Sequence, residues 1–514
     1  MTSPSAARKG LRRAVFAGPL LIFVLLIMTS LIAPQALLRT ASWLNTLILD
    51  LFAYAFAWVA FGFVLTCLWA ALSPLGKIRI GGAAARPIVS RWNWMAITLT
   101  TTLAIGILFW ATAEPIYHLT DPGERNVSPG SAGAAQFALS SLYMHWSVTP
   151  YAIYTVAGLT FALAYHSWRL PFSLASPFRI ITGRPVPRVA EDSLDGLAVL
   201  ALLLGLSSSL GTGILSLAGS LDRISGSGTG PWVTGLFALL IICGFAASSM
   251  SGLQRGIKYL SDINTRLFIV FLIAVFLFGP TVQIVKMSGG ALIDYGMDFL
   301  PRSLLLAPFD NLDWSKSWTI FYIATWLAWA PLAAMFLGRI ARGYTVREYV
   351  FVNLVLPASF SILWMSIFGG LAITLEMNSP GTLSDILSSG GPERVLYAVL
   401  NTMPMGLLLA VIIVLLSYLS YVTAADSSTS VLAQITDHDS EPRPDGVQPP
   451  RIGPKLVFAC AVGLTGWIMI SLSGIDGVRM LSNLGGLPAL FIVGAFNLVL
   501  IWMGTKGLKV LRDA

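Results

Sequence analysis

Residues 321–349 read FYIATWLAWAPLAAMFLGRIARGYTVREY, an apolar run that ends in a basic, polar tail. A helix needs about 20 mostly apolar residues to cross the hydrocarbon of a bilayer. The stretch 317–341 is therefore predicted to be a transmembrane helix. Pro331 lies in its middle and lacks a backbone N–H, which permits local unwinding in a membrane-embedded helix.

The rest of the chain has the same character. Of its 514 residues, 56% are hydrophobic and 11% charged, whereas a soluble domain is about a quarter charged. The apolar stretches do not alternate with polar residues, which argues against a transmembrane barrel. We predict an all-α integral membrane protein with twelve transmembrane helices: 14–33, 51–72, 95–112, 146–166, 194–215, 232–250, 262–284, 317–341, 349–374, 406–434, 455–473 and 485–506.

The basic residues indicate how the chain is oriented. If the spans alternate in direction, 24 of the 32 Lys and Arg residues fall on the side that holds both tails. Cytoplasmic loops are enriched in these residues, so both termini are predicted to be cytoplasmic in a plasma membrane. Orientation also explains the net charge of +8 without a nucleic-acid partner. The first span follows basic residues, as in a signal peptide, but its apolar run is too long, and we interpret it as a retained anchor.

Several function classes lack their motifs. Cys67, Cys243 and Cys460 are widely spaced, which excludes a disulfide framework and a CxxC metal site. The chain has no HExxH motif, nucleophile elbow, Walker A motif or selectivity-filter repeat, which argues against a metalloenzyme, a hydrolase, an ATP-driven pump and a channel. We therefore predict no catalytic residue, no metal ligand and no organic cofactor.

Aromatic and acidic residues inside the predicted spans are the candidate functional groups. Trp326 and Trp329 lie one turn apart in mid-helix, too deep for an interfacial belt. Indole binds desolvated cations most strongly, by about 2 kcal/mol or more, with buried packing as the alternative role. Glu114, in FWATAEP (109–115), either caps a helix end or belongs to the pathway. The polar patch that includes Thr423, Asp426 and Ser427 fits an ion path, a packed interface or a helix end.

These motifs resemble the betaine/carnitine/choline transporter family. The resemblance is carried by TWLAWAPLAAMFLGRIARGYTVREY (325–349), HWSVTPYAIY (145–154), SGLQRGIKYLSDIN (251–264), YVTAADSS (421–428) and the Glu-Pro pair at 114–115. It implies a LeuT-like fold with two inverted five-helix repeats after two extra helices. The implied segments are an N-tail and two helices (1–90), a first repeat (91–284), an external loop with an interfacial helix (285–316), a second repeat (317–506) and a short cytoplasmic tail (507–514).

The resemblance also implies a binding site. Family members hold a quaternary ammonium in an aromatic box, and the matching positions here are Trp146, Tyr151, Tyr154, Trp326 and Trp329, with Tyr117 as a further match. The implied activity is secondary transport, by alternating access, of glycine betaine, choline, carnitine or a sulfonium analogue. The alternative is a LeuT-fold transporter for an amino acid or amine. Family members are typically homotrimers.

Three departures from the family pattern affect the site. Thr325 replaces the first Trp of a pair, Tyr151 stands where Trp is usual, and the Gly-rich stretch of helix 3 is reduced to TLAIG (102–106). A polar wall at Thr325 would suit a smaller betaine, a sulfonium analogue or an amine that can form a hydrogen bond.

The coupling ion, Na⁺ or H⁺, is predicted to use helix 10. Sodium-driven members carry a Thr-Ser pair there, whereas this chain has Thr423-Ala424 and so lacks one hydroxyl ligand. The candidate coupling residues are Thr423, Ser427 and Arg266, the last because some sodium-independent members place an Arg on helix 7.

Overall fold

The computed structural model describes residues 10–102, 106–123, 125–226, 228–250, 254–437 and 451–513. Across these residues the chain is helical, with two isolated β-bridges and no longer strand. Nine of the described helices are long and apolar enough to cross a membrane, and one further pair of helices is sharply bent. The predicted all-α membrane protein is thereby confirmed.

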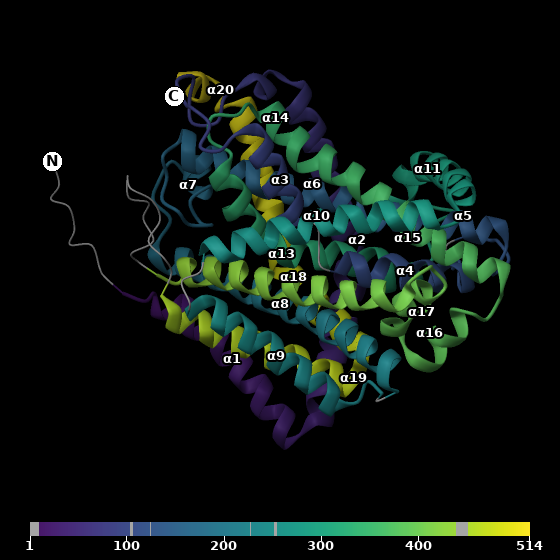
Figure 1. Cartoon of the computed structure of the whole chain (residues 1–514). Helices are drawn as coiled ribbons and strands as arrows, with labels where there is room; N and C mark the ends of the chain where they lie inside the picture. Colours follow the sequence, from purple (N-terminus) through teal and green to yellow (C-terminus); the bar gives the residue numbers. More distant parts are fainter. Residues whose placement is uncertain are drawn as a thin grey trace.

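Within the described residues, fourteen helices of 12 or more residues build the body of the molecule (Figure 1). They are α1 (Arg13–Ile32), α2 (Pro34–Leu72), α3 (Arg91–Thr102), α4 (Gly106–Thr120), α5 (Ala132–Trp146), α6 (Val148–Ala162), α8 (Arg188–Ser225), α9 (Pro231–Met250), α10 (Gln254–Phe278), α11 (Thr281–Leu304), α13 (Phe321–Ile340), α15 (Leu356–Asn378), α18 (Gly406–Ile435) and α19 (Ile452–Thr505).

Short helices and π-helical turns connect or extend these elements. The short helices are α7 (Phe178–Thr182), α12 (Leu312–Ser315), α14 (Val346–Val350), α16 (Ser384–Gly390), α17 (Val395–Asn401), α20 (Leu508–Asp513) and the 3₁₀ turns η1 (Pro74–Lys77) and η5 (Pro392–Arg394). The π-helical turns are η2 (Leu163–Ser167), η3 (Lys316–Ile320) and η4 (Phe351–Val355).

Some predicted helix boundaries were wrong. The helix expected at 146–166 begins at Ala132 and breaks at Ser147, where α5 gives way to α6. Residues 34–50, expected as a loop, are helical because α2 starts at Pro34. The expected loop 474–484 is also helical, with Gly474 (φ 55°) as its interruption. A single glycine can turn the chain in this way, so a polar loop is not needed between two spans.

The span before the predicted external loop ends earlier than expected. α10 ends at Phe278 rather than near 284, and the chain bends by 104° into α11, which overlaps the segment 285–316 that was predicted to hold an interfacial helix. The helices α16 and α17 were not predicted. Residues 103–105 of TLAIG, 251–253 of SGLQRGIKYLSDIN and 438–450 lie outside the described residues.

Ion pairs join segments that the charge count assigns to the same side. On one side, Arg12 contacts Asp192 and Asp195 at 2.5 Å each. In the same region the backbones of 78–80 and 343–346 exchange hydrogen bonds. In Figure 1, α7 and α14 lie at this end of the bundle, and α5, α11, α16 and α17 lie at the other. Pairs on the second side are Lys316–Asp50, Arg394–Asp222 and the contacts of Arg125 with Asp294 and Asp298.

The centre of the molecule is formed by α6, α8, α13 and α19, which pack closely on one another. Glycines allow this close approach. A Cβ at Gly486 of α19 would lie 2.6 Å from the Cα of Ala324 in α13, and one at Gly205 of α8 would lie 2.9 Å from the Cβ of Ala328. Small residues are the usual means of bringing membrane helices together. In contrast, α1 and α10 present apolar side chains outward, such as Leu31 and Phe278.

We expect Gly486→Ala to destabilise the protein by about 1–3 kcal/mol, because the added methyl group overpacks the α13–α19 contact. Gly494→Ala is the matched control on the same helix, since its Cβ would meet no atom closer than 3.6 Å. In the control, replacing glycine by alanine should stabilise the helix by up to about 1 kcal/mol, because alanine has the higher helix propensity. Thermal unfolding of both variants in detergent tests this. Equal melting temperatures would show that the contact relaxes without cost.

Candidate substrate site

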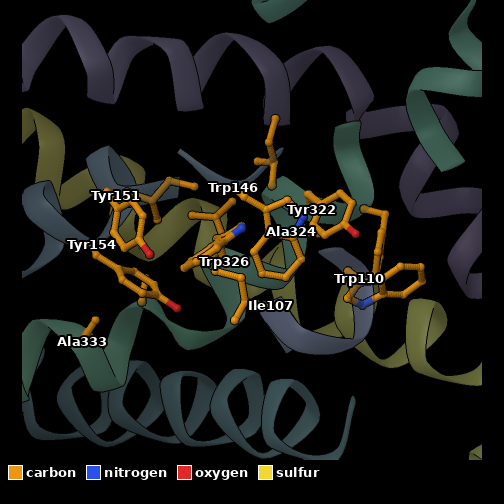
Figure 2. Close-up of a cluster of buried hydrophobic side chains, with 14 of the residues drawn as sticks. Ile107, Trp110, Trp146, Tyr151, Tyr154, Tyr322, Ala324, Trp326 and Ala333 are labelled. Carbon is orange, nitrogen blue, oxygen red and sulfur yellow. The ribbon is translucent and has the colours of Figure 1, made fainter. Parts of the chain in front are cut away.

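Four aromatic side chains gather at the centre of the molecule. The ring of Trp326 on α13 lies 5.8 Å from Trp146, 5.4 Å from Tyr151 and 5.1 Å from Tyr154, measured between centroids. All four are buried. Figure 2 shows the two tyrosines on one side of Trp326 and Trp146 on the other. We call these four side chains the ring cluster.

The break at Ser147 shapes the ring cluster. Trp146 is the last residue of α5, whereas Tyr151 and Tyr154 belong to α6. Ser147 has φ −118° and ψ −108°, outside the helical region, so the two helices need not share one periodicity. This lets residues only a few positions apart approach Trp326 from different directions. The Tyr151 hydroxyl is also fixed by a 3.0 Å hydrogen bond to Ser361 on α15.

The structure separates the other predicted box residues from the ring cluster. Trp329 lines a separate cavity together with Tyr421, Ala424 and residues of α8, α9 and α19. Thr325 donates its hydroxyl hydrogen to the carbonyl of Phe321, one turn earlier in its own helix. Tyr117 packs on Trp318, with ring centroids 5.1 Å apart.

Glu114 lies beside the ring cluster and is fully buried. Four groups surround its carboxylate. Trp146 Nε1 donates to Oε2 at 2.9 Å and the Tyr322 hydroxyl donates to the same oxygen at 2.5 Å. His145 Nδ1 and His118 Nε2 lie 2.6 Å and 3.3 Å from Oε1. Of the two roles considered for Glu114, a cap at a helix end does not fit, because α4 continues to Thr120.

A second aromatic group lies next to Glu114, on the far side of Tyr322 from Trp326 (Figure 2). It contains Trp110, Trp318 and Phe321, and the guanidinium of Arg479 lies 4.5 Å from the Trp318 ring centroid. Arg479 also lies within 6.0 Å of the other two rings. The protein therefore places a cation of its own on tryptophan faces in this region.

The predicted coupling residues do not form one cluster. Thr423 and Ser427 on α18 donate their hydroxyls to carbonyls of their own helix, and Ser427 is exposed. Arg266 is exposed on α10. Ala424, which lies between Thr423 and Ser427 in sequence, lines the cavity together with Trp329. Asp426 pairs with Lys455 of α19 at 2.8 Å, and this contact joins two helices.

Sequence reasoning missed several residues that contact the site. His118, Tyr322, Trp318 and Arg479 were not proposed, and His145 was quoted only as part of a motif. For Tyr322 a signal was present, since it lies one turn before Trp326 on the same helix. No sequence signal places Arg479, which is brought in by the interruption of α19 at Gly474.

The chain matches the family model described as "betaine/carnitine/choline family transporter" over residues 14–509. It belongs to this family. The predicted family and the transporter class are thus confirmed, and the protein is not an enzyme.

This chain is 31% identical to a "Probable glycine betaine transporter" of Desulfitobacterium hafniense, over 82% of this chain and 84% of that protein. It is 34% identical to "Glycine betaine transporter 1" of Vibrio parahaemolyticus, over 73% of this chain and 71% of the relative. It is 28% identical to an "Ectoine/hydroxyectoine transporter" of Virgibacillus pantothenticus, over 89% of each chain.

In this family member, Tyr322→Phe should cost about 1.5–3 kcal/mol of stability, because it removes a donor from a buried carboxylate. Tyr143→Phe is the control. It removes a neutral hydrogen bond to Ser366 from an equally buried tyrosine and should cost about 0.5–1.5 kcal/mol. Melting temperatures in detergent compare the two. A smaller loss for Tyr322→Phe than for Tyr143→Phe would contradict this account of the Glu114 carboxylate.

Proposed function

We propose that this transporter carries a small solute with a quaternary ammonium group, of the glycine betaine, choline or carnitine type, or a sulfonium analogue. The ring cluster is the observation that supports this most directly. A permanent cation cannot lose its charge by deprotonation, and burying it beside a carboxylate costs desolvation of both ions. Stacked ring faces attract such a cation without a second full charge.

The aromatic group around Arg479 supports the same chemistry. Its rings attract a delocalised protein cation at 4.5 Å, within the range of about 6 Å for cation–π attraction. A trimethylammonium group has a similar size and charge. We propose that substrate enters past this group and is held at the ring cluster.

We propose that the box consists of Trp146, Tyr151, Tyr154 and Trp326, and the short distances between their rings support this choice. Trp329 is proposed to line the route beyond the box instead, because it faces the separate cavity. Thr325 can offer only an oxygen lone pair, since its hydroxyl hydrogen is engaged. The relative named for ectoine suggests delocalised cations with N–H groups as a second substrate class.

We propose a twelve-span, LeuT-like architecture that works by alternating access. This count takes α3 together with α4 as one span, includes α10, and divides α19 at Gly474. The inverted repeats would cover 91–284 and 317–506. The ion pairs support the alternation of spans, and the excess of Lys and Arg on one side supports cytoplasmic termini.

Trp326→Ala should abolish high-affinity uptake of labelled glycine betaine into vesicles, because the ring shared by all three contacts is lost. Trp326→Phe should retain partial uptake, since a smaller ring face remains. Initial rates are measured at matched amounts of membrane-inserted protein.

The matched control is Trp364→Ala on α15, where a buried tryptophan stacks on Phe368 at 4.6 Å, outside the ring cluster. It should keep substrate affinity, even if it lowers expression. Wild-type affinity in Trp326→Ala would mean that this residue serves packing alone.

We propose that sodium coupling is weak or absent, and that Ala424→Ser strengthens it. Thr423 supplies one hydroxyl, while its neighbour supplies a methyl group. A hard cation needs oxygen ligands in place of its water, so each missing oxygen weakens binding. Uptake rate against sodium concentration, in wild type and variant, is the measurement. Steep, saturable activation of the wild type at low millimolar sodium would contradict the proposal.

A further inference from the structure

Four groups contact the Glu114 carboxylate, two on each oxygen. Trp146 and Tyr322 donate to Oε2, and His145 Nδ1 and His118 Nε2 lie within hydrogen-bond distance of Oε1. A carboxylate has about four lone-pair positions and no hydrogen to donate. The arrangement therefore fits the deprotonated acid, with both imidazoles donating from the nitrogen that faces it. An uncompensated negative charge in a water-poor interior is costly, so the site favours a compensating proton.

His145 can take that proton without losing a hydrogen bond. Its Nδ1 faces Glu114, and its Nε2 lies 3.1 Å from the Thr319 hydroxyl. A threonine hydroxyl can donate to neutral imidazole or accept from imidazolium. Thr319 can therefore reverse its hydrogen bond when His145 is protonated. At His118, Nδ1 is buried and has no hydrogen-bond partner in the described part of the chain, so a second proton there would be unsupported.

A small cavity lies beside this pair. It is lined by His145, Thr149, Thr319 and Tyr322, among others. Because the Thr319 hydroxyl contacts His145 Nε2, the exchangeable proton on Nε2 faces a residue that lines this cavity, whereas Nδ1 faces Glu114.

Other charged and titratable groups surround this pair. Arg302 of α11 is buried over the Phe137 ring at 4.9 Å and donates to Ser140 and Ser141 of α5, the helix that carries His145. Arg479 of α19 lies 4.5 Å from the Trp318 ring centroid, and His118 packs against the same ring. Tyr322 stacks on the His145 ring at 4.7 Å, and the Glu114 carboxylate contacts Nδ1 of that ring. The two guanidiniums repel an extra proton on His145, and the Glu114 carboxylate attracts it.

The pair is connected to the ring cluster by two indoles. Trp146 donates to Glu114, and Trp326 Nε1 donates to the backbone carbonyl of His145 at 3.1 Å. A cation on these ring faces and a proton on His145 are like charges in one low-dielectric region. Two unit charges about 10 Å apart at an effective dielectric constant of about 20 change each other's affinity by about tenfold.

We propose that Glu114 and His145 form a proton-binding site whose occupancy competes with the cationic substrate, so that substrate binding releases a proton from His145. The inference rests on the proposed function, since it requires a cation on the ring cluster. The proton passes from Nε2 to water, and no other group changes its bonding except the Thr319 hydroxyl, which reverses its hydrogen bond. Linkage is reciprocal, so a protonated site must bind substrate more weakly by the same factor.

Calorimetry on the detergent-solubilised wild-type protein tests this with glycine betaine as the probe, whose charged groups do not titrate between about pH 5 and pH 8.5. Titrations are run across this range in two buffers of different ionisation enthalpy. We expect Kd to rise about tenfold toward low pH, and the heats in the two buffers to differ by the release of up to one proton. A Kd independent of pH, with equal heats, would overturn the proposal.

Variants locate the effect. His145→Gln should make Kd independent of pH, whereas His166→Gln is the control, because His166 contacts the carbonyls of Gly338 and Arg339 instead. If His166→Gln removed the pH dependence of Kd and His145→Gln did not, the assignment of the proton to His145 would be overturned. If His145→Gln does not fold, the wild-type buffer comparison still decides.

Two further outcomes are distinguishable. The buried Glu114, His118 and His145 ligand atoms lie within 4.8 Å of one another, so a divalent cation is the competing occupant. Loss of the pH dependence after treatment with EDTA would overturn the proton site in its favour. If glycine betaine does not bind at any pH, the proposed function fails. Infrared difference spectra of the substrate-free protein then test the proton site alone, through an imidazolium signal that is present in wild type and absent in His145→Gln.

Discussion

The site depends on one buried carboxylate. Glu114 on α4 accepts hydrogen bonds from the end of α5 and from α13, so a single side chain holds together helices that are far apart in sequence. A carboxylate in a dry interior is tolerated only when its oxygens are satisfied. The positions of Trp146, His145 and Tyr322 are therefore coupled, because moving any one of them leaves the charge short of a donor.

Length and apolarity were enough to predict the class of fold, because the bilayer imposes a minimum run of apolar residues on every spanning helix. They could not predict interruptions. The break at Ser147 and the turn at Gly474 each occupy one residue, so neither changes the hydropathy of its surroundings. The prediction also placed a loop between successive spans. It therefore treated the helical segments 34–50 and 474–484 as loops.

The candidate site was predicted in part, and the errors have a common cause. Spacing along a helix places Trp326 and Trp329 on nearby faces, yet a neighbouring helix decides what each face meets. Trp326 meets the rings of α5 and α6, whereas Trp329 meets the cavity beside α18. Arg479 is a stronger case, because its partners on α4, η3 and α13 are more than 150 positions away in the sequence. Such contacts are fixed by tertiary packing alone.

The Glu114 carboxylate lies behind the ring cluster rather than among its rings, and the energetic cost of a buried ion pair explains this arrangement. In contact with an ammonium group, a buried carboxylate would bind tightly but would itself need to be desolvated. Here Trp146 lies between the two charges: its N–H points to Glu114, and its ring packs on Trp326 in an edge-to-face contact. Donating that N–H to an anion polarises the indole and makes its ring face more negative, which strengthens cation–π attraction. The negative charge thus acts on the ring cluster through an aromatic side chain. It increases the attraction for a cation without forming an ion pair that the proposed substrate would have to break in order to leave.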